Sequence, residues 1–162
     1  MKKSESDSAR KARQKAIRFL TTRDRTRYEM QQYLARSGFR KNEIDEVLEW
    51  VTELGYLDDA RCAKNWVEYR NRFRPTGNYL LRLELEKKGI CDDIINEVLN
   101  DKDKEMSLAK EVVEKGYRAL KDSPLDKCYR KLGSLLQRRG FSWEITRKVL
   151  ADVLPHLLDT DL

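Results

Sequence analysis

The side chains in this sequence most able to do chemistry are lysines and arginines, which bind phosphates and carboxylates through charge-assisted hydrogen bonds. Three arginines fall in a turn expected between two helices, two others share one face near the end of a later helix, and two basic pairs stand directly before glycines. The set is Arg23, Arg25, Arg27, Arg70, Arg74, Lys87, Lys88, Arg138 and Arg139. These residues are our candidates for contacts with a polyanion. The alternative is that they offset helix dipoles and keep the surface soluble.

The other residue types that carry chemistry lack the partners that they need. His156 is the only histidine and stands near the C-terminus, so no Ser/His/Asp or Cys/His set can form without it. The glycines are scattered singly and make no nucleotide-binding loop. The pairs Asp58-Asp59 and Asp92-Asp93 precede expected helices, where carboxylates cap free N–H groups. We therefore expect a binding protein that is not an enzyme and that uses no metal or cofactor.

The bulk composition favours a polyanion-binding protein of the cytoplasm. The 162 residues include 34 Lys/Arg and 28 Asp/Glu, a net charge of +6, and basic and acidic blocks alternate along the chain. The three cysteines, Cys62, Cys91 and Cys128, form no C-x-x-C pair and suit free thiols in a reducing compartment. No apolar run approaches the ~18 residues of a membrane span. The polar start of the chain is unlike a secretory signal.

A phrase that recurs every 51 residues indicates how the basic side chains are positioned. LARSGF, LEKKGI and LQRRGF place the glycines Gly38, Gly89 and Gly140. A leucine stands four residues before each glycine and another apolar residue eight before it, a row that forms one stripe of a helix. Glycine tolerates the left-handed conformation that closes such a helix. Each repeat is therefore predicted to contain a helix that ends at its glycine, and Gly55 closes a further helix in the same way.

Two other amphipathic helices are expected beside each of these. One follows the glycine, with Val-Leu nine and ten residues after it, and one precedes the phrase. In the middle repeat the preceding helix presents Cys62, Trp66, Tyr69 and Phe73 as one apolar face, and the breaker RPTG (74–77) ends it. The predicted fold class is all-α, with three tandem three-helix, helix-turn-helix-like repeats of about 51 residues that stack into an elongated molecule.

The predicted boundaries follow from these patterns. They are a flexible basic N-terminal arm at 1–12, repeats at 13–58, 59–101 and 102–154, and a C-terminal tail at 155–162.

Two neighbouring segments resemble the signature of the RecX family of bacterial regulatory proteins. They are GYLDDARCAKNWVEYR (55–70) and RPTGNYLLRLELEKKGI (74–90). RDRTRYEMQQYLARSGF (23–39) is similar to the first repeat of that family, and LLQRRGFSWEITRKVL (135–150) to its third. The resemblance covers roughly residues 14–154 and is weakest in the third repeat.

The resemblance implies both a shape and a function. RecX-like proteins are curved, elongated molecules of three three-helix repeats. They lie in the groove of the filament that RecA recombinase forms on single-stranded DNA, and they lower its ATPase and strand-exchange activities. The family acts in DNA repair by homologous recombination and in the SOS response, without enzyme activity or a cofactor. It has no motif-defined catalytic residues, so our candidate contacts rest on charge alone. We expect a monomer that contacts the RecA filament and its single-stranded DNA.

Two other functions fit the same residues. One is a free-standing nucleic-acid-binding helical regulator that needs no RecA. The basic N-terminal segment and the helix-turn-helix-like repeats favour this function. The other is a protein-interaction scaffold whose basic edge is only a solvated face. Added salt weakens direct DNA binding steeply and leaves a scaffold almost unchanged. The sequence leaves open whether RecA is inhibited or assisted, which repeat makes the decisive contacts, and what the N-terminal arm does.

Overall fold

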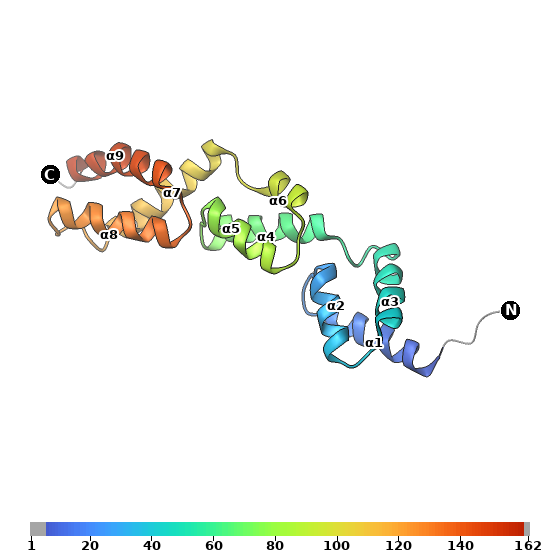
Figure 1. The fold of residues 1–162 in the computed structure, drawn as a ribbon. Coiled ribbons are helices and arrows are strands. Elements are labelled where there is room, and N and C mark those ends of the chain that lie inside the picture. Colours follow the sequence, from blue (N-terminus) through green and yellow to red (C-terminus); the bar gives the residue numbers. More distant parts are fainter. Residues whose placement is uncertain (1–5, 161–162) are drawn as a thin grey trace. The chain divides into compact units, whose positions relative to one another are not determined.

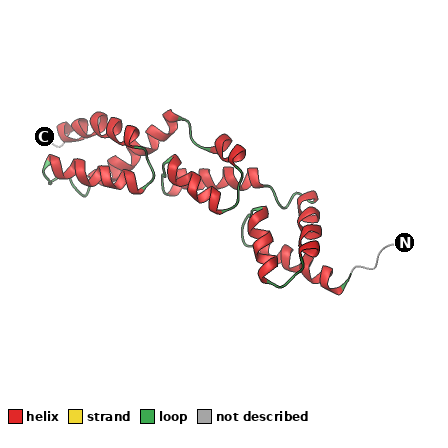
Figure 2. Cartoon of the chain, in the orientation of Figure 1, coloured by secondary structure: helices red, strands yellow, loops and turns green. Residues whose placement is uncertain are grey.

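The computed structural model describes residues 6–160, and in this part of the chain all regular structure is helical (Figures 1 and 2). The helices are α1 Asp7–Leu20, α2 Arg27–Arg36, α3 Lys41–Glu53, α4 Asp59–Phe73, α5 Asn78–Lys87, α6 Asp92–Val98, α7 Lys102–Tyr117, α8 Leu125–Arg138 and α9 Trp143–Thr160. They succeed one another as three groups of three. The prediction of an all-α fold with tandem three-helix repeats is confirmed.

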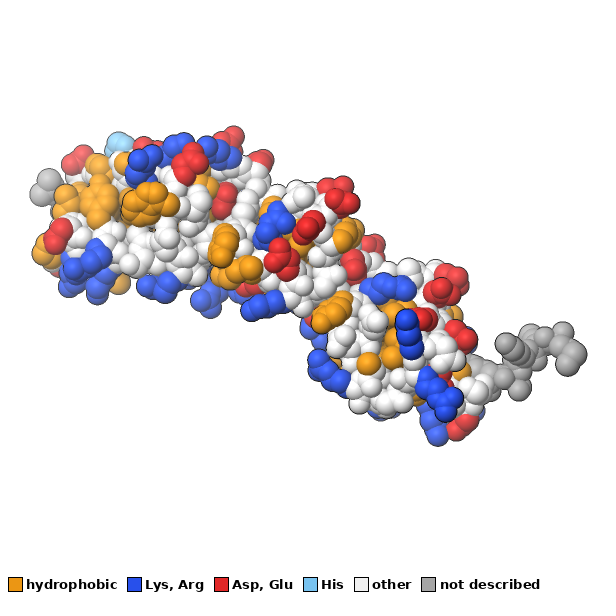
Figure 3. Space-filling view, viewed as in Figure 1, with side chains coloured by type: hydrophobic (Ala, Val, Ile, Leu, Met, Phe, Trp, Pro, Cys, Tyr) orange, Lys and Arg blue, Asp and Glu red, His pale blue; other side chains and the backbone are white. Residues whose placement is uncertain are grey.

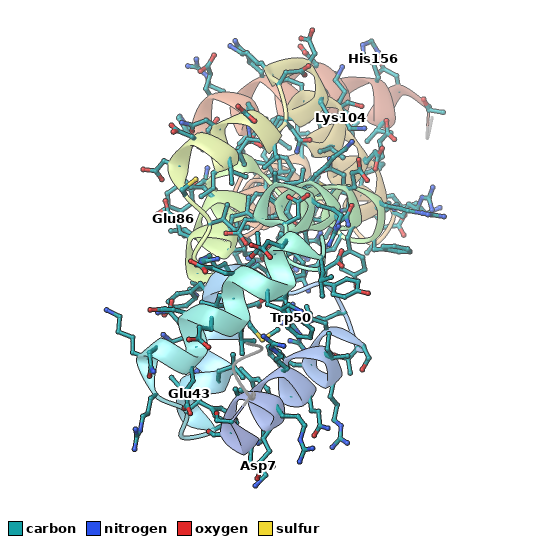
Figure 4. The ribbon with its side chains drawn as sticks, turned by 90° about the vertical axis from the view of Figure 1, so that its right-hand side faces the viewer. Asp7, Glu43, Trp50, Glu86, Lys104 and His156 are labelled. Carbon is teal, nitrogen blue, oxygen red and sulfur yellow. The ribbon has the colours of Figure 1, made fainter. Side chains whose placement is uncertain are left out.

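Most helix ends are where the sequence places them. Gly38, Gly55, Gly89 and Gly140 all have positive φ, between 74° and 88°, which confirms them as left-handed helix caps. The segment 74–77 separates α4 from α5, as the breaker predicts. Asp7 and Glu43 stand in the first turns of α1 and α3, where a carboxylate favours the positive end of the helix (Figure 4).

Both ends of the chain are more helical than expected. Helix α1 begins at Asp7, inside the arm expected at residues 1–12, because the side chain of Ser6 accepts a hydrogen bond from the backbone N–H of Ala9. Residues 1–5 of that arm lie outside the described residues. Helix α9 continues through Pro155 to Thr160, into the expected tail, because Leu157 and Leu158 pack against the core of the third repeat.

The chain divides into two compact units. The first contains the chain up to residue 65 together with 85–95, and the second contains 66–84 and the chain from 96 onward. The division passes through α4, α5 and α6, so each of these helices contributes one part to each unit.

The core of the first unit is the apolar cluster between α1, α2 and α3. Its fully buried members include the predicted stripe residues Met30 and Leu34, packed with Val47, Leu48 and Val51. Ala12 and Ala16 let α1 approach the other two helices closely because they have no side chain beyond Cβ. The rows spaced by three and four residues therefore do form the buried face of each helix.

The core of the second unit is larger and lies between α7, α8 and α9. Leu132 and Leu136 of α8, the predicted stripe, are buried against Val113 of α7 and Val149 and Leu154 of α9. Leu157 and Leu158 pack on the edge of this cluster. The third repeat is thus a complete three-helix bundle.

One predicted apolar face is wrong for most of its length. Trp66, Tyr69 and Phe73 do stack in series on α4, with ring centroids 5.9 and 5.1 Å apart. However, Tyr69 and Phe73 are 52% and 65% exposed. The buried stripe of α4 is the neighbouring one, through Ala63 and Val67, which the small side chain of Ala63 allows to pack closely. The spacing of the apolar residues correctly predicts a helix, but it does not show which side of α4 is buried.

Candidate basic binding surface

Two sets of contacts between successive repeats, here called joints, determine which basic residues are free. In the first unit, Thr26 precedes α2, and its hydroxyl donates a hydrogen bond of 2.6 Å to the backbone carbonyl of Lys88 at the end of α5. Gly89 lies against the side chain of Tyr28, so closely that a Cβ at this glycine would overlap the tyrosine. Asp59 of α4 accepts the backbone N–H of Arg27 at 2.8 Å and so caps α2.

The second unit contains an equivalent joint, displaced by 51 residues. The backbone N–H of Gly77 donates a hydrogen bond of 2.7 Å to the carbonyl of Arg139, at the positions that correspond to Thr26 and Lys88. Gly140 lies against Leu80, where a Cβ would overlap both side chain and backbone. Glu105 of α7 accepts the backbone N–H of Asn78 at 2.8 Å and caps α5 as Asp59 caps α2. The joint is therefore a repeated device.

The paired aspartates have separate roles. Asp58 accepts the backbone N–H of Arg61 at 3.0 Å and caps its own helix, α4, as the sequence predicts. Asp59 caps a helix of the preceding repeat instead. No sequence pattern indicates that second contact, because the two partners are separated by 32 residues.

The candidate arginines of the first repeat are occupied within the fold. Arg23 forms an ion pair of 2.9 Å with Glu29. Arg25 lies over the ring of Phe19, 4.0 Å from its centroid, and donates to the Phe19 carbonyl. Arg27 reaches Thr52 with its guanidinium at 3.5 Å. Arg23 and Arg25 thus hold the turn between α1 and α2 together, and Arg27 connects α2 with α3.

Glu29 interacts with several positively charged and N–H groups around this turn. Its carboxylate accepts hydrogen bonds from Arg23 and from the backbone N–H of Thr26, and it lies 3.6 Å from the ammonium group of Lys88. Burial acts to raise the pKa of Glu29, but these hydrogen bonds and the two positive charges bring the pKa below its ordinary value. Lys88, one of the candidate contacts, is thus turned towards the joint.

Arg70 is also paired. Its guanidinium makes two hydrogen bonds to the carboxylate of Glu84, one of them 3.0 Å from Nε, and the indole N–H of Trp66 donates to the same carboxylate at 2.8 Å. The guanidinium also lies 4.9 Å from the centre of the Trp66 ring. This bidentate contact satisfies most of the binding capacity of Arg70.

The side chain of Arg139 makes contacts within the second joint. Its guanidinium donates to the carbonyl of Pro75 at 3.2 Å. Partial burial and the nearby charges of Arg74 and Arg70 lower its pKa from the ordinary arginine value. Arg70, Arg74 and Arg139 are therefore the candidate residues that the second unit brings together, and Arg74 is the exposed one of the three.

The exposed members of the basic pairs occupy one position of the repeat. Lys87 and Arg138, each two residues before its capping glycine, are exposed and make no hydrogen bond or ion pair with another described residue. Arg36 stands at the same position before Gly38, and it too is exposed without such a contact. Arg36 was not among the candidates predicted from the sequence, although the 51-residue spacing that defines the repeat points directly to it.

Exposed aromatic rings lie beside the exposed cations of the middle repeat. Phe73 has the guanidinium of Arg72 5.2 Å from its ring centre, and Tyr79 at the start of α5 is 70% exposed. Tyr69 lies beside Phe73 on α4, with ring centroids 5.1 Å apart. Sequence reasoning assigned Phe73 to a core because exposed and buried rings have the same spacing along a helix.

Other kinds of site find no support among residues 6–160. No three His, Cys, Asp or Glu side chains in this range are grouped as metal ligands would be. None of the described helices is both long and apolar enough to cross a membrane. His156 projects from α9 with an exposed side chain (Figure 4).

The fold and the exposed cations define a class of protein, an all-α chain of tandem three-helix repeats with a repeated basic position. Family models described as the first, second and third three-helix domains of RecX match residues 12–50, 58–99 and 103–150. The chain belongs to the RecX family.

Individual relatives agree with this assignment. The "Regulatory protein RecX" of Prosthecochloris aestuarii is 37% identical, over 93% of this chain and 98% of that protein. The protein with the same description from Chlorobium phaeobacteroides is 36% identical, over 89% and 94%. The crystal structure of RecX from Lactobacillus salivarius covers 91% of this chain and 97% of its own with a TM-score of 0.82; at 22% identity it establishes a shared fold.

Proposed function

We propose that this protein regulates the RecA recombinase, binding the filament that RecA forms on single-stranded DNA and lowering its ATPase and strand-exchange activities. The observation that carries the proposal is membership of the RecX family through all three repeats. The exposed basic position supports it. Arg36, Lys87 and Arg138 recur every 51 residues at the same position of each repeat, so each repeat offers one exposed cation to a polyanionic partner.

Two mechanisms are compatible with these contacts. In the first, the protein bridges neighbouring RecA subunits and blocks their addition or release. In the second, it competes with the second DNA molecule for the groove of the filament. In either case the repeats supply several weak contacts, and their linkage raises the affinity of the whole chain above that of any one repeat.

The test is the rate of DNA-dependent ATP hydrolysis by RecA of the same organism, titrated with this protein. We expect the rate to fall at less than one molecule of protein per RecA subunit, because one regulator at a filament end or between subunits affects several subunits. A flat rate, with no binding of the protein to the assembled filament, would contradict the proposal.

A second candidate function is direct binding of single-stranded nucleic acid without RecA. The exposed rings of Tyr69 and Phe73, with Arg72 beside Phe73, favour it, because bases stack on aromatic side chains while cations neutralise the phosphates. Binding to labelled oligo(dT) without RecA, weakening steeply between 50 and 200 mM salt, would support this function. Absence of binding at 50 mM salt would reject it.

A further inference from the structure

A groove between α8 and α9 is lined largely by apolar surface of the third repeat. Its volume is about 980 Å³. Trp143, 67% exposed, and Tyr129, 36% exposed, form parts of its walls, and Leu150 and Ala151 of α9 face them. Figure 3 shows hydrophobic side chains gathered over α8 and α9, with Lys and Arg side chains around them. The groove lies wholly within the second compact unit.

A glycine in the middle of α8 places no long side chain in the groove. Gly133 costs about 1 kcal/mol of helix stability relative to alanine. It does not have the positive φ of the capping glycines, and a Cβ there would meet only Leu150 at an ordinary 3.6 Å. Neither backbone conformation nor core packing requires glycine at this position. Its effect is to leave room for a group that approaches from outside.

In the middle repeat a side-chain bridge spans the equivalent place. The residues that correspond to Gly133 and Arg147, 51 positions earlier, are Arg82 and Asn96. The guanidinium of Arg82 donates a hydrogen bond to the Asn96 side chain and so bridges α5 and α6 across the equivalent place. In the third repeat Gly133 replaces the bridging arginine, and Arg147, which replaces the asparagine, has no partner for such a bridge.

The rim of the groove carries positive charge without internal partners. Arg130, Arg138 and Arg147 are exposed and make no ion pair with any residue between 6 and 160. By contrast, nearby Lys148 is paired with Glu144 at 2.9 Å. Asp126 is the carboxylate among the lining residues. An apolar floor with three free arginines is complementary to a segment that has apolar side chains and carboxylates.

We propose that this groove binds an acidic, amphipathic helical segment of the recombinase, an inference that rests on the proposed function. The apolar face of the segment packs on Trp143, Tyr129 and Leu150, in the way that an amphipathic helix occupies the groove of a partner. Its carboxylates pair with Arg130, Arg138 and Arg147. Nucleic acid is the other candidate occupant, because the rings of Trp143 and Tyr129 beside free arginines also suit base stacking. The apolar floor of Leu150 and Ala151 between two helices favours a protein segment, whose apolar side chains fill such a groove.

The test compares variants in their affinity for the RecA filament, by anisotropy of labelled protein. Gly133→Arg places in the groove the residue that the middle repeat has there. It also adds a positive charge, so a purely electrostatic attraction would be kept or strengthened, whereas occupancy of the groove would be blocked. We expect Gly133→Arg, Trp143→Ala and Arg147→Glu each to weaken binding about tenfold or more, as central anchors do.

Matched controls separate this site from general effects. Gly133→Ala fits the available space and leaves the groove open, so it should bind as the wild type does. Gln31→Arg adds the same charge as Gly133→Arg at the corresponding position of the first repeat, and it should not weaken binding. Circular dichroism checks that every variant keeps its helices. In the wild type, binding should shift the emission of Trp143 to shorter wavelength, a change absent from Trp143→Phe.

The possible outcomes distinguish failure of this inference from failure of the proposed function. If the wild type binds the filament and the groove variants bind equally well, this inference is wrong and the proposed function stands. If the wild type does not bind the filament, the proposed function fails and the inference with it. If the groove variants lose affinity for bare oligo(dT) to the same extent, the occupant is nucleic acid and the proposed protein segment is rejected.

Discussion

At the scale of single residues, surroundings separate side chains of the same type. The pKa of the Cys62 thiol is raised to about 11, first by burial and then by the negative charges of Asp24 and Asp59. Its Sγ donates to the carbonyl of Arg25 at 3.3 Å. Cys128 is also buried, whereas Cys91 is exposed. Three cysteines that look alike in the sequence should therefore differ in reactivity.

We predict that iodoacetamide at pH 8 modifies Cys91 first and reaches Cys62 and Cys128 only after unfolding, because the thiolate is the reactive form and needs access to solvent. Peptide mass spectrometry after timed labelling measures the three rates. The same experiment in 6 M guanidinium is the control, in which the three rates should converge. Equal rates in the native protein would contradict the burial of Cys62.

Glu29 gives a pH-dependent prediction. Its pKa in the folded protein lies below the ordinary value of 4.5, so the carboxylate stabilises the fold above that pH, and the contribution is lost as the pH falls. Glu29→Gln keeps a side chain able to close the capping box with Thr26 and removes only the charge. We expect the variant to be less stable than the wild type at pH 7, and the difference to shrink below about pH 4.5.

Urea unfolding followed by circular dichroism between pH 7 and pH 3 measures this difference. Glu46→Gln, an exposed carboxylate on α3, is the control and should change stability little at any pH. A difference between wild type and Glu29→Gln that stays constant with pH would show that the charge of Glu29 does not act through its ion pairs.

At the scale of helices, the capping glycines form two classes that the sequence does not distinguish. Gly38 has positive φ and open space around it, whereas Gly140 has positive φ and also touches Leu80 in the joint. We predict that Gly38→Ala costs about 1–2 kcal/mol, the strain of a left-handed residue with a Cβ. Gly140→Ala should cost about 1–3 kcal/mol more, because the joint must also open. Urea midpoints of the two variants measure this, and equal losses would contradict the close approach at Gly140.

The joint also explains why one residue of each basic pair is exposed while the other makes contacts within the fold. The carbonyls of Lys88 and Arg139 accept the hydrogen bonds that connect successive repeats, and their side chains turn to Glu29 and to Pro75. Consecutive residues at a helix end point about 100° apart, so Lys87 and Arg138 face solvent instead. The sequence identified both pairs as one candidate surface, whereas only one member of each is free.

At the scale of the whole molecule, this division predicts two kinds of variant. We expect the triple change of Arg36, Lys87 and Arg138 to Ala to weaken filament binding and to flatten its salt dependence, because up to three counterion-releasing contacts are lost. Helix content and thermal stability should stay near those of the wild type. Titration of labelled protein into RecA filaments at several salt concentrations provides the measurement.

The matched variant changes Lys88 and Arg139 to Ala. It should lower the unfolding midpoint through the loss of contacts at both joints and should change the salt slope less than the triple variant does. If the triple variant keeps both its affinity and its salt slope, the repeated basic position is only a solvated face, as the alternative interpretation of these residues holds.

What the sequence determined by itself is everything that depends on local period. The 51-residue spacing, the apolar rows and the glycines specified three repeats of three helices and the caps that end them, because a helix imposes its geometry on neighbouring residues. The tertiary structure alone decided which charges are free. Arg70 is neutralised by Glu84 and Lys88 by Glu29 only because folding brings these distant residues together, and Trp143 and Phe73 are exposed because no neighbouring helix covers them. Pairing and burial depend on contacts between segments far apart in the chain, and no local pattern encodes them.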